Sequence, residues 1–368
     1  MYGRYFLWSV VIIKKYDKIL FISVIIISIF GLIMIYSSSS IWAAYKFNDS
    51  FKYLKNQLMF LIIGLVLMYV ISKIDYMNYK NKANIIFFGC FLLLILVLIP
   101  GIGSVRNGSR SWFGIGGFGI QPSEFMKLSL IIFTAKYLEK IKKINFIAII
   151  PIFIVTLLVF GIIMLQPDFG TGTIIVITII SLLFISGLNM SFFVKGGIIG
   201  IIGVIILILI APYRMDRITS FINPWNDPLG TGFQIIQSLY AIGPGGLLGM
   251  GLGGSIQKHF YLPEPQTDFI FSIISEELGF LGIIVVTTLF ITIIYRGIKI
   301  SLNSKDLFSK YLAFGITFSL AFQTILNLSV VIGLIPVTGV TLPFLSYGGS
   351  SLLITLCSIG ILLNISRK

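Results

Sequence analysis

The chain has 368 residues, of which 57% are hydrophobic and 11% are charged. Soluble domains carry about 25% charged residues, so this composition excludes an ordinary soluble globular protein. The formal charge of +14 could indicate nucleic-acid binding, but the basic residues follow the loops between apolar runs. The composition therefore predicts an integral membrane protein without a nucleic-acid partner.

Roughly ten apolar runs have the length of about 20 residues that a helix needs to cross a bilayer. They predict an all-α integral membrane protein with about ten transmembrane helices in a single polytopic domain, residues 1–368. The expected helices cover approximately residues 19–38, 57–72, 83–100, 122–138, 145–165, 171–189, 192–211, 267–295, 310–335 and 347–365. The first run is too long for a signal peptide and lacks a convincing cleavage site, so we expect it to be retained.

Lysine and arginine residues divide unequally between alternate loops. One set of loops and chain ends holds 18 of them and the other set holds eight, with Lys127 just inside a helix. Because cytoplasmic loops are enriched in lysine and arginine, both termini are predicted to be cytoplasmic. Two long segments, residues 101–121 and about 212–266, then lie outside the cell. Long ordered loops are usually functional, so the extracytoplasmic face is the expected working face.

The fourth predicted helix begins within QPSEFMKLSL, which starts at Gln121. Pro122 and Ser123 suit a helix start, and Glu124 and Lys127 lie three residues apart on one helical face. These two side chains predict either a self-neutralising pair at a helix end or a polar cavity that meets a charged substrate.

Two further polar stretches interrupt the apolar runs. In LQPDFGTGT the proline and glycines suit a tight outer turn, and Asp168 either forms that turn or helps to shape a site. GPGGLLGMGLGG, residues 243–254, contains the pattern G-x-G-x-x-G, but no strand is predicted before it, so it does not indicate dinucleotide binding. Its glycines predict a loop that packs tightly or moves.

The segment HFYLPEPQTDFIFSIISEELG, residues 259–279, gathers four of the 13 acidic residues into apolar sequence. These residues are Glu264, Asp268, Glu276 and Glu277. Prolines resist helix, so the eighth long helix is expected to begin near Gln266 or Thr267, with Asp268 in its first turn. Glu276 would then lie about 12 Å deeper than Asp268.

Two effects act on Asp268 in opposite directions. A helix N-terminus favours the ionised carboxylate, whereas an apolar setting raises the pKa towards that of a useful general base. A capping role and a catalytic role both remain open for Asp268. Glu276 and Glu277 are expected to be structural, either paired or hydrogen-bonded within the helix bundle.

The outer face also carries basic side chains that suit an anionic lipid headgroup or a pyrophosphate. They are Arg110, Lys127, Arg214, Arg217, Lys258 and His259. His259 is the only histidine, so neither a zinc site built on several histidines nor a Ser-His-Asp hydrolase is supported. Cys90 and Cys357 lie in apolar runs and are expected to be packing residues.

Taken together, five long motifs in this order resemble the SEDS proteins (shape, elongation, division and sporulation), which are polytopic peptidoglycan glycosyltransferases. The motifs are NGSRSWFGIGGFGIQPSEFMK, LQPDFGTGT, NPWNDPLGTGFQIIQSLYAIGPGGLLGMGLG, YLPEPQTDFIFSIISEELG and IPVTGVTLPFLSYGGSSL. Within this family, NPWNDPLG and LPEPQTDFIF look like the FtsW and SpoVE branch more than the RodA branch. The short termini resemble those of its sporulation members.

The resemblance implies ten transmembrane helices, cytoplasmic ends and a large outer loop between helices seven and eight. It implies polymerisation of lipid II into β-1,4-linked glycan strands, in cell division or spore cortex synthesis, beside a class B penicillin-binding protein. The family's essential aspartate corresponds to Asp268 and its important tryptophan to Trp112. Its polar pair corresponds to Glu124 and Lys127.

A lipid pyrophosphate leaves without a strong general acid, so one carboxylate can suffice where glycoside hydrolases need two. We therefore expect Asp268 to take the proton from the acceptor hydroxyl as it attacks the donor sugar. Arg110 and Lys127, or a divalent cation such as Mg²⁺ or Mn²⁺, would offset the charge of the leaving group. The remaining predicted substrate-binding residues are Trp112, Glu124, Asp168, Lys258 and Glu264.

Two other functions use the same residues. A lipid II flippase would move the headgroup along the buried ions, and a noncatalytic scaffold would recruit the penicillin-binding protein through its helices. Synthesis of glycan strands by purified protein in detergent would distinguish the polymerase from both.

Overall fold

The computed structural model describes residues 16–106, 108–115, 118–141, 145–210 and 212–367, without the side chains of residues 106, 115, 118, 207 and 212–214. Several basic residues of the charge pattern lie outside this description. They are Arg4, Lys14, Lys15, Lys142, Lys143 and Lys368, together with the side chains of Arg106 and Arg214.

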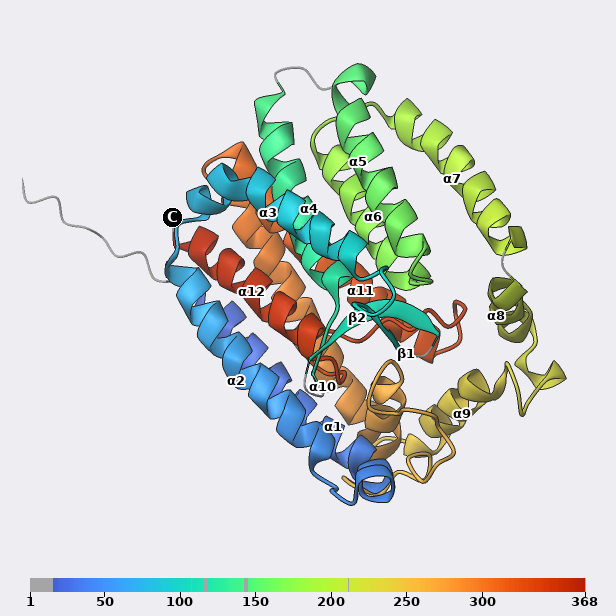
Figure 1. Ribbon diagram of the computed structural model, residues 1–368. Coiled ribbons are helices and arrows are strands. Elements are labelled where there is room, and N and C mark those ends of the chain that lie inside the picture. Colours follow the sequence, from blue (N-terminus) through green and yellow to red (C-terminus); the bar gives the residue numbers. More distant parts are fainter. Residues whose placement is uncertain (1–15, 107, 116–117, 142–144, 211, 368) are drawn as a thin grey trace, which may run out of the picture.

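Ten long helices occupy the ten predicted positions in the described part of the chain, and they pack side by side as a bundle (Figure 1). They are α1 (Lys18–Phe47), α2 (Lys52–Lys73), α3 (Tyr76–Leu96), α4 (Pro122–Lys140), α5 (Phe146–Met164), α6 (Phe169–Ile185), α7 (Met190–Ile210), α10 (Ile270–Leu302), α11 (Leu307–Val331) and α12 (Gly349–Ser366). The expected helical membrane fold is confirmed.

Eight of these described helices are long and apolar enough to cross a membrane by themselves. The other two are α6, which has 17 residues, and α4, whose sequence PSEFMKLSLIIFTAKYLEK includes charged residues at both ends. Both pack within the bundle, where neighbouring helices replace lipid around their polar groups. The chain is therefore a multi-pass membrane protein.

The helices differ greatly in how much of their surface is covered. Most of the apolar length of α11 and α12 is buried, whereas none of the corresponding length of α7 is. Aromatic side chains near the start of α7 hold it to its neighbours, because Phe192 contacts Phe146 and Phe193 contacts Phe184. Beyond this point α7 stands at the edge of the molecule and continues towards the short helix α8 (Pro212–Ile222) (Figure 1).

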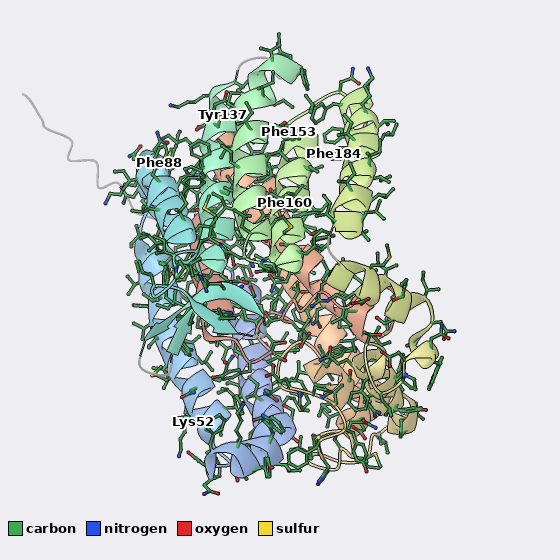
Figure 2. The ribbon with its side chains drawn as sticks, turned by 45° about the vertical axis from the view of Figure 1, so that its right-hand side comes forward. Lys52, Phe88, Tyr137, Phe153, Phe160 and Phe184 are labelled. Atoms are coloured by element: carbon green, nitrogen blue, oxygen red, sulfur yellow. The ribbon has the colours of Figure 1, made fainter. Side chains whose placement is uncertain are left out.

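Both long segments predicted to lie outside the cell contain ordered structure. Residues 101–121 form a three-stranded antiparallel sheet in the order β1 (Ser104–Arg106), β2 (Ser109–Ile115) and β3 (Phe118–Ile120), which the sequence did not predict. The segment between α7 and α10 contains α8, η1 (Pro224–Asn226), α9 (Phe233–Ile242) and η2 (Gly243–Gly245). Figure 2 shows Lys52 at one end of the bundle and Tyr137 near the other.

The glycine-rich loop, residues 243–254, fills a break in α10. Gly279 has φ 61° and ψ −154°, which interrupts the helix and leaves backbone groups without helical partners. The loop supplies them: Met250 N donates to Glu276 O (2.9 Å), and Gly251 N donates to Glu277 O (2.9 Å). On the far side of the break, Phe280 N donates to Gly246 O at 2.9 Å. The prediction that this loop packs tightly is confirmed.

Two buried carboxylates hold the residues that follow the glycine-rich loop. Glu276 accepts hydrogen bonds from Ser255 Oγ (2.5 Å) and Ile256 N (2.9 Å). Glu277 accepts from Ser37 Oγ of α1 and from Lys258 Nζ at 2.9 Å. Glu276 and Glu277 are therefore structural, as predicted, because buried charges are stable only when they are paired or hydrogen-bonded.

The close packing of the helix break predicts that Gly279→Ala destabilises the protein. An added Cβ would lie 2.4 Å from Gly249 N and 2.7 Å from Gly245 O, both backbone atoms, and φ is already positive. Overpacking together with the unfavourable φ should cost at least about 2 kcal/mol. Thermal unfolding of the purified protein in detergent measures this loss.

Gly243→Ala is the matched control, because its φ is −59° and its added Cβ would meet nothing within 4 Å. Equal unfolding midpoints for the two variants would show that the loop does not fill the break as described.

Candidate active site

Asp268 lies in the turn that leads into α10 and not in the helix itself. The expected helix start near Gln266 or Thr267 is wrong, since α10 begins at Ile270 with Phe269 as its N-cap residue. Glu264 has φ 44°, and Thr267 N donates to Glu264 O at 3.0 Å, so the chain turns before the helix begins. Thr267 Oγ1 lies within hydrogen-bond distance of Glu264 O (2.7 Å) and Asp268 Oδ1 (2.9 Å), and does not cap the helix.

Burial dominates the electrostatics of Asp268. It raises the pKa of this carboxyl group above the ordinary value, and the nearby charge of Glu264 acts in the same direction. The hydrogen bond from Thr267 and the charge of Arg217 on α8 oppose the rise without cancelling it. Asp268 is only half-buried in the structure. The residue is thus partly exposed, and its carboxylate is more basic than that of an ordinary aspartate.

Glu124 and Lys127 form the ion pair that their spacing predicted. Pro122 is the first residue of α4, and Lys127 Nζ lies 2.8 Å from Glu124 Oε2 with both side chains buried. Lys127 Nζ also donates to Gln323 Oε1 of α11 at 2.7 Å. The ammonium charge is therefore balanced by a carboxylate and directed by an amide.

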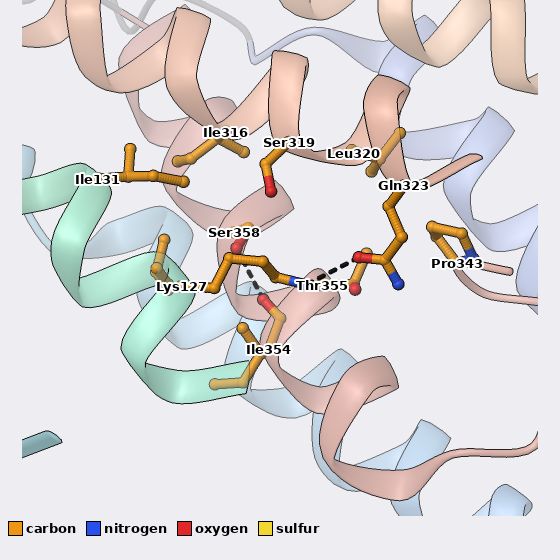
Figure 3. A pocket seen from close by; sticks show the side chains of 11 residues that line it. Lys127, Ile131, Ile316, Ser319, Leu320, Gln323, Pro343, Ile354, Thr355 and Ser358 are labelled. Carbon is orange, nitrogen blue, oxygen red and sulfur yellow. Dashed lines mark hydrogen bonds between the residues drawn. The ribbon is translucent and has the colours of Figure 1, made fainter. Parts of the chain in front are cut away.

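A small cavity with both apolar and polar lining lies beside this pair, between α4, α11 and α12. Its volume is about 30 Å³, and its lining includes Lys127, Ser319, Gln323 and Thr355. Figure 3 shows Lys127 and Gln323 facing each other at the cavity. Ser319 Oγ is buried without a hydrogen-bond partner among the described residues. The cavity has the size of a site for about one water molecule, with polar atoms of Lys127, Ser319 and Gln323 at its wall.

Asp168 lies beside the same pair. Its Oδ1 accepts a hydrogen bond from Thr171 N (3.1 Å) and thereby caps α6, while its Oδ2 accepts from Gln121 Nε2 (3.0 Å). Burial raises the pKa of Asp168, and the charges of Glu124 and Lys127 act on it in opposite directions. Asp168 both forms the turn and joins the polar group at the start of α4.

Trp112 and Arg110 lie on β2, two residues apart, in the part of the strand where the pairing with β1 changes register. Ser104 Oγ donates to Trp112 O at 2.9 Å and holds β1 against β2. Ser109 Oγ bonds Gln166 O, which attaches the sheet to the turn before Asp168. The sheet is thereby fixed to the polar group around Glu124.

Lys258 lies apart from Asp268. Its ammonium group donates to Glu277 Oε1 (2.9 Å) and to Gly253 O (2.6 Å), and its side chain is 5% exposed. In this structure the charge of Lys258 is used to hold the loop in the break of α10. Glu264, in contrast, lies close enough to Asp268 for its charge to act on that carboxyl group.

The predicted residues thus form two polar groups, one around Asp268 and one around Glu124, Lys127 and Asp168. Two buried amides of α11 connect them: Gln323 contacts Lys127, and Asn327 Nδ2 donates to Asp268 O at 2.7 Å. The sequence analysis did not select these amides. Two polar residues four positions apart in an apolar run were the available signal, because this spacing places them on one helical face.

The described residues include no group of three or more histidine, cysteine, aspartate or glutamate side chains that could hold a metal ion. Glu264 and Asp268 are the two neighbouring carboxylates of the site. Magnesium is often bound by one or two carboxylates together with substrate phosphates. A cation at these two carboxylates would therefore need further ligands from a substrate.

Comparison with known proteins gives a consistent result over the whole length. The family model for FtsW, RodA and SpoVE, described as cell cycle protein, matches residues 17–368. Stage V sporulation protein E of Bacillus subtilis (strain 168) is 55% identical over 354 residues, which are 95% of this chain and 97% of that protein. The probable peptidoglycan glycosyltransferase FtsW of Trichlorobacter lovleyi is 43% identical, over 96% of this chain and 94% of that protein.

Solved structures show the same fold. A chain from "Structural coordination of polymerization and crosslinking by a peptidoglycan synthase complex" has a TM-score of 0.78 and 32% identity, covering 96% of this chain and 98% of that chain. Rod shape determining protein RodA of Thermus thermophilus has a TM-score of 0.72 and 29% identity, covering 96% of this chain and 97% of that chain.

Proposed function

The chain belongs to the FtsW, RodA and SpoVE family and is a peptidoglycan glycosyltransferase, and we propose that it polymerises lipid II with Asp268 as the general base. The observation that carries the proposal is the half-buried carboxylate of Asp268, whose pKa is raised by burial at the start of α10. A base with a raised pKa accepts a proton more readily than an ordinary carboxylate.

In the proposed reaction, Asp268 accepts the proton of the GlcNAc 4-hydroxyl group of the acceptor. The hydroxyl oxygen attacks C1 of the donor MurNAc, and the bond between C1 and the pyrophosphate oxygen breaks. The lipid pyrophosphate leaves with the electron pair, and C1 is inverted to give a β-1,4 bond. No carboxylic acid is needed for the leaving group, in contrast to glycoside hydrolysis.

Cationic side chains stabilise the departing pyrophosphate. Arg110 and Lys127 were expected in this role, and Arg217 joins them because its charge acts on Asp268 and its side chain is exposed. Its Nη1 donates to Val337 O at 2.9 Å, which orients the guanidinium group. The carboxylates of Glu264 and Asp268 would hold a divalent cation, which would supply further charge neutralisation when bound.

The site faces the outside of the cell in this proposal, with both termini in the cytoplasm. Support comes from the excess of basic residues at the opposite end of the helices. The partner is a class B penicillin-binding protein that cross-links the new strands, in keeping with the similarity to a chain of a peptidoglycan synthase complex. The identity of 55% with a stage V sporulation protein favours a role in spore formation.

The decisive experiment adds lipid II to the purified protein in detergent and measures glycan strands, with and without the partner and divalent cations. We expect strands to form. A flippase gives no product there, because detergent has no two sides for it to connect. A noncatalytic scaffold also gives no product, even when it binds the added penicillin-binding protein. The absence of glycan strands under all of these conditions would contradict the proposal.

A further inference from the structure

Asn327 on α11 makes two hydrogen bonds that join separate parts of the chain. Its Nδ2 donates to Asp268 O at 2.7 Å and to Val340 O at 2.8 Å, and the residue is 1% exposed. The Asp268 carbonyl precedes the hydrogen-bond ladder of α10, whose first turn is closed by Ser272 N and Phe269 O (3.0 Å). Asn327 therefore holds a carbonyl group that the helix does not hold.

A second hydrogen bond holds the same turn two residues earlier. Tyr347 N, from the segment between α11 and α12, donates to Gln266 O at 2.8 Å, while Asn327 of α11 holds Asp268 O, so the chain is held on both sides of Thr267. The backbone at Asp268 is thereby fixed from two directions. The carboxylate itself contacts Thr267 Oγ1 and takes no part in these bonds.

The segment between α11 and α12 also reaches the other polar group of the site. Gln323 Nε2, one turn before Asn327, donates to Thr341 O at 2.9 Å while its Oε1 accepts from Lys127. Val340 packs against Gly170 in the first turn of α6, where an added Cβ would lie 2.4 Å from Val340 Cγ2. Asn327 and Gln323 of α11 thus bond two successive residues of this segment, Val340 and Thr341, and connect Asp268 with the group around Lys127.

The chemistry of position 327 favours an amide. The side-chain NH₂ group has two donors and can therefore bond both carbonyl oxygens. In the flipped orientation the amide oxygen, which only accepts, would face both carbonyl oxygens and bond neither. Asn327 Oδ1 is buried without a partner among the described residues, so this orientation leaves one acceptor unsatisfied. The two bonds to carbonyl groups therefore determine the orientation.

We propose that Asn327 is a positioning residue for the reaction, because its amide holds the backbone of Asp268 and so fixes where the carboxylate lies relative to the acceptor hydroxyl group. This inference rests on the proposed function of Asp268. A misplacement of about 1 Å can cost about 100-fold in rate, since proton transfer requires the base within hydrogen-bond distance. Asn327 acts through Asp268 and does not itself contact the substrate.

The test compares Asn327→Ala with Asn364→Ala. Asn364 lies near the C-terminal end of α12, away from Asp268. Asn364 is also buried and also makes two bonds, since its Nδ2 donates to Ser72 O and its Oδ1 accepts from Tyr76 N, both at 3.0 Å. Initial rates of lipid II polymerisation are measured over a range of lipid II concentrations. Unfolding midpoints are recorded for both variants, so that each assay is run well below them.

For Asn327→Ala we expect kcat to fall by about 10- to 100-fold with KM changed less than about threefold. Asn364→Ala should lose comparable stability but keep both constants near those of the unchanged protein. Equal kcat values for the two variants would overturn the inference if Asp268→Ala is inactive in the same assay. If Asp268→Ala is active, the proposed function itself fails.

If Asn327→Ala does not fold, Asn327→Ser replaces it, because serine keeps one donor. The serine variant should recover part of the lost kcat. Hydrogen exchange at Phe269 N–H and Ile270 N–H reports whether the turn at Asp268 remains fixed. Full activity of Asn327→Ser together with rapid exchange at these two groups would also overturn the inference.

Discussion

Replacement of Asp268 by alanine or asparagine is expected to abolish glycan synthesis while leaving a folded protein in the membrane. The proton of the acceptor hydroxyl group then has no acceptor in the site, and loss of a general base typically costs 10²- to 10⁴-fold in rate. Lipid II consumption by the purified variants, measured against the unchanged protein, gives the loss directly.

Folding should not suffer from the Asp268→Asn change. Because burial raises the pKa of Asp268 in the folded protein, protonation favours the folded state. The stability from this protonation is present below the ordinary pKa and is lost as pH rises through the raised pKa. Above the ordinary pKa, the cost of burying the ionised carboxylate therefore opposes folding, and the asparagine variant should be at least as stable. Asp49→Asn at the exposed turn after α1 is the control and should keep its activity.

The raised pKa of Asp268 also predicts how the rate of polymerisation depends on pH. Polymerisation should fall as pH decreases through the raised pKa of Asp268, so the acid limb of kcat should lie above the ordinary value of 3.8. The charge of Glu264 adds to the rise, and the charge of Arg217 opposes it. A rate that stays constant down to pH 4, or polymerisation retained by Asp268→Ala, would exclude Asp268 as the base.

Lys258→Met is expected to destabilise the protein by about 3–5 kcal/mol, which is the usual cost of removing one partner from a buried ion pair. Glu277 would keep 0% side-chain exposure, with Ser37 Oγ and Ser255 N as its remaining donors among the described residues. The loop in the break of α10 would also lose its bond from Lys258 to Gly253 O. Denaturant or thermal unfolding in detergent measures the change.

The double variant Lys258→Met/Glu277→Gln separates a structural role from substrate binding. Removal of both charges leaves no unpaired ion, so most of the stability should return. If Lys258 acts only on Glu277, glycan synthesis should return with it. Stable but inactive double-variant protein, with a raised KM for lipid II, would instead show that Lys258 contacts the substrate.

Lys55→Met is the matched control for this pair. Lys55 Nζ lies 2.9 Å from Asp49 Oδ2 on the exposed turn between α1 and α2, with side-chain exposures of 66% and 33%. Water screens such a pair, so its loss should change stability little. Equal losses in the two lysine variants would contradict the buried pairing of Lys258.

Much of the site followed from local spacing along the chain. Glu124 and Lys127 are three residues apart on a helix that starts at a proline, and they pair as that spacing predicts. Asp168 follows a proline and forms a turn that caps α6. The prediction failed at the start of α10, because the positive φ of Glu264 and the bonds of Thr267 depend on the loop that packs around them.

The sequence by itself determined the membrane class, the positions of the ten long helices and the presence of a polar site, since hydrophobic length and helical spacing are local properties. Only the tertiary structure decided which charges serve the fold. Lys258 forms an ion pair with Glu277, and Asn327 donates a hydrogen bond to the backbone of Asp268, 59 residues away in the chain. Such pairings depend on how the helices pack and on which loop fills a broken helix, and residues far apart in the chain carry no local pattern that fixes them.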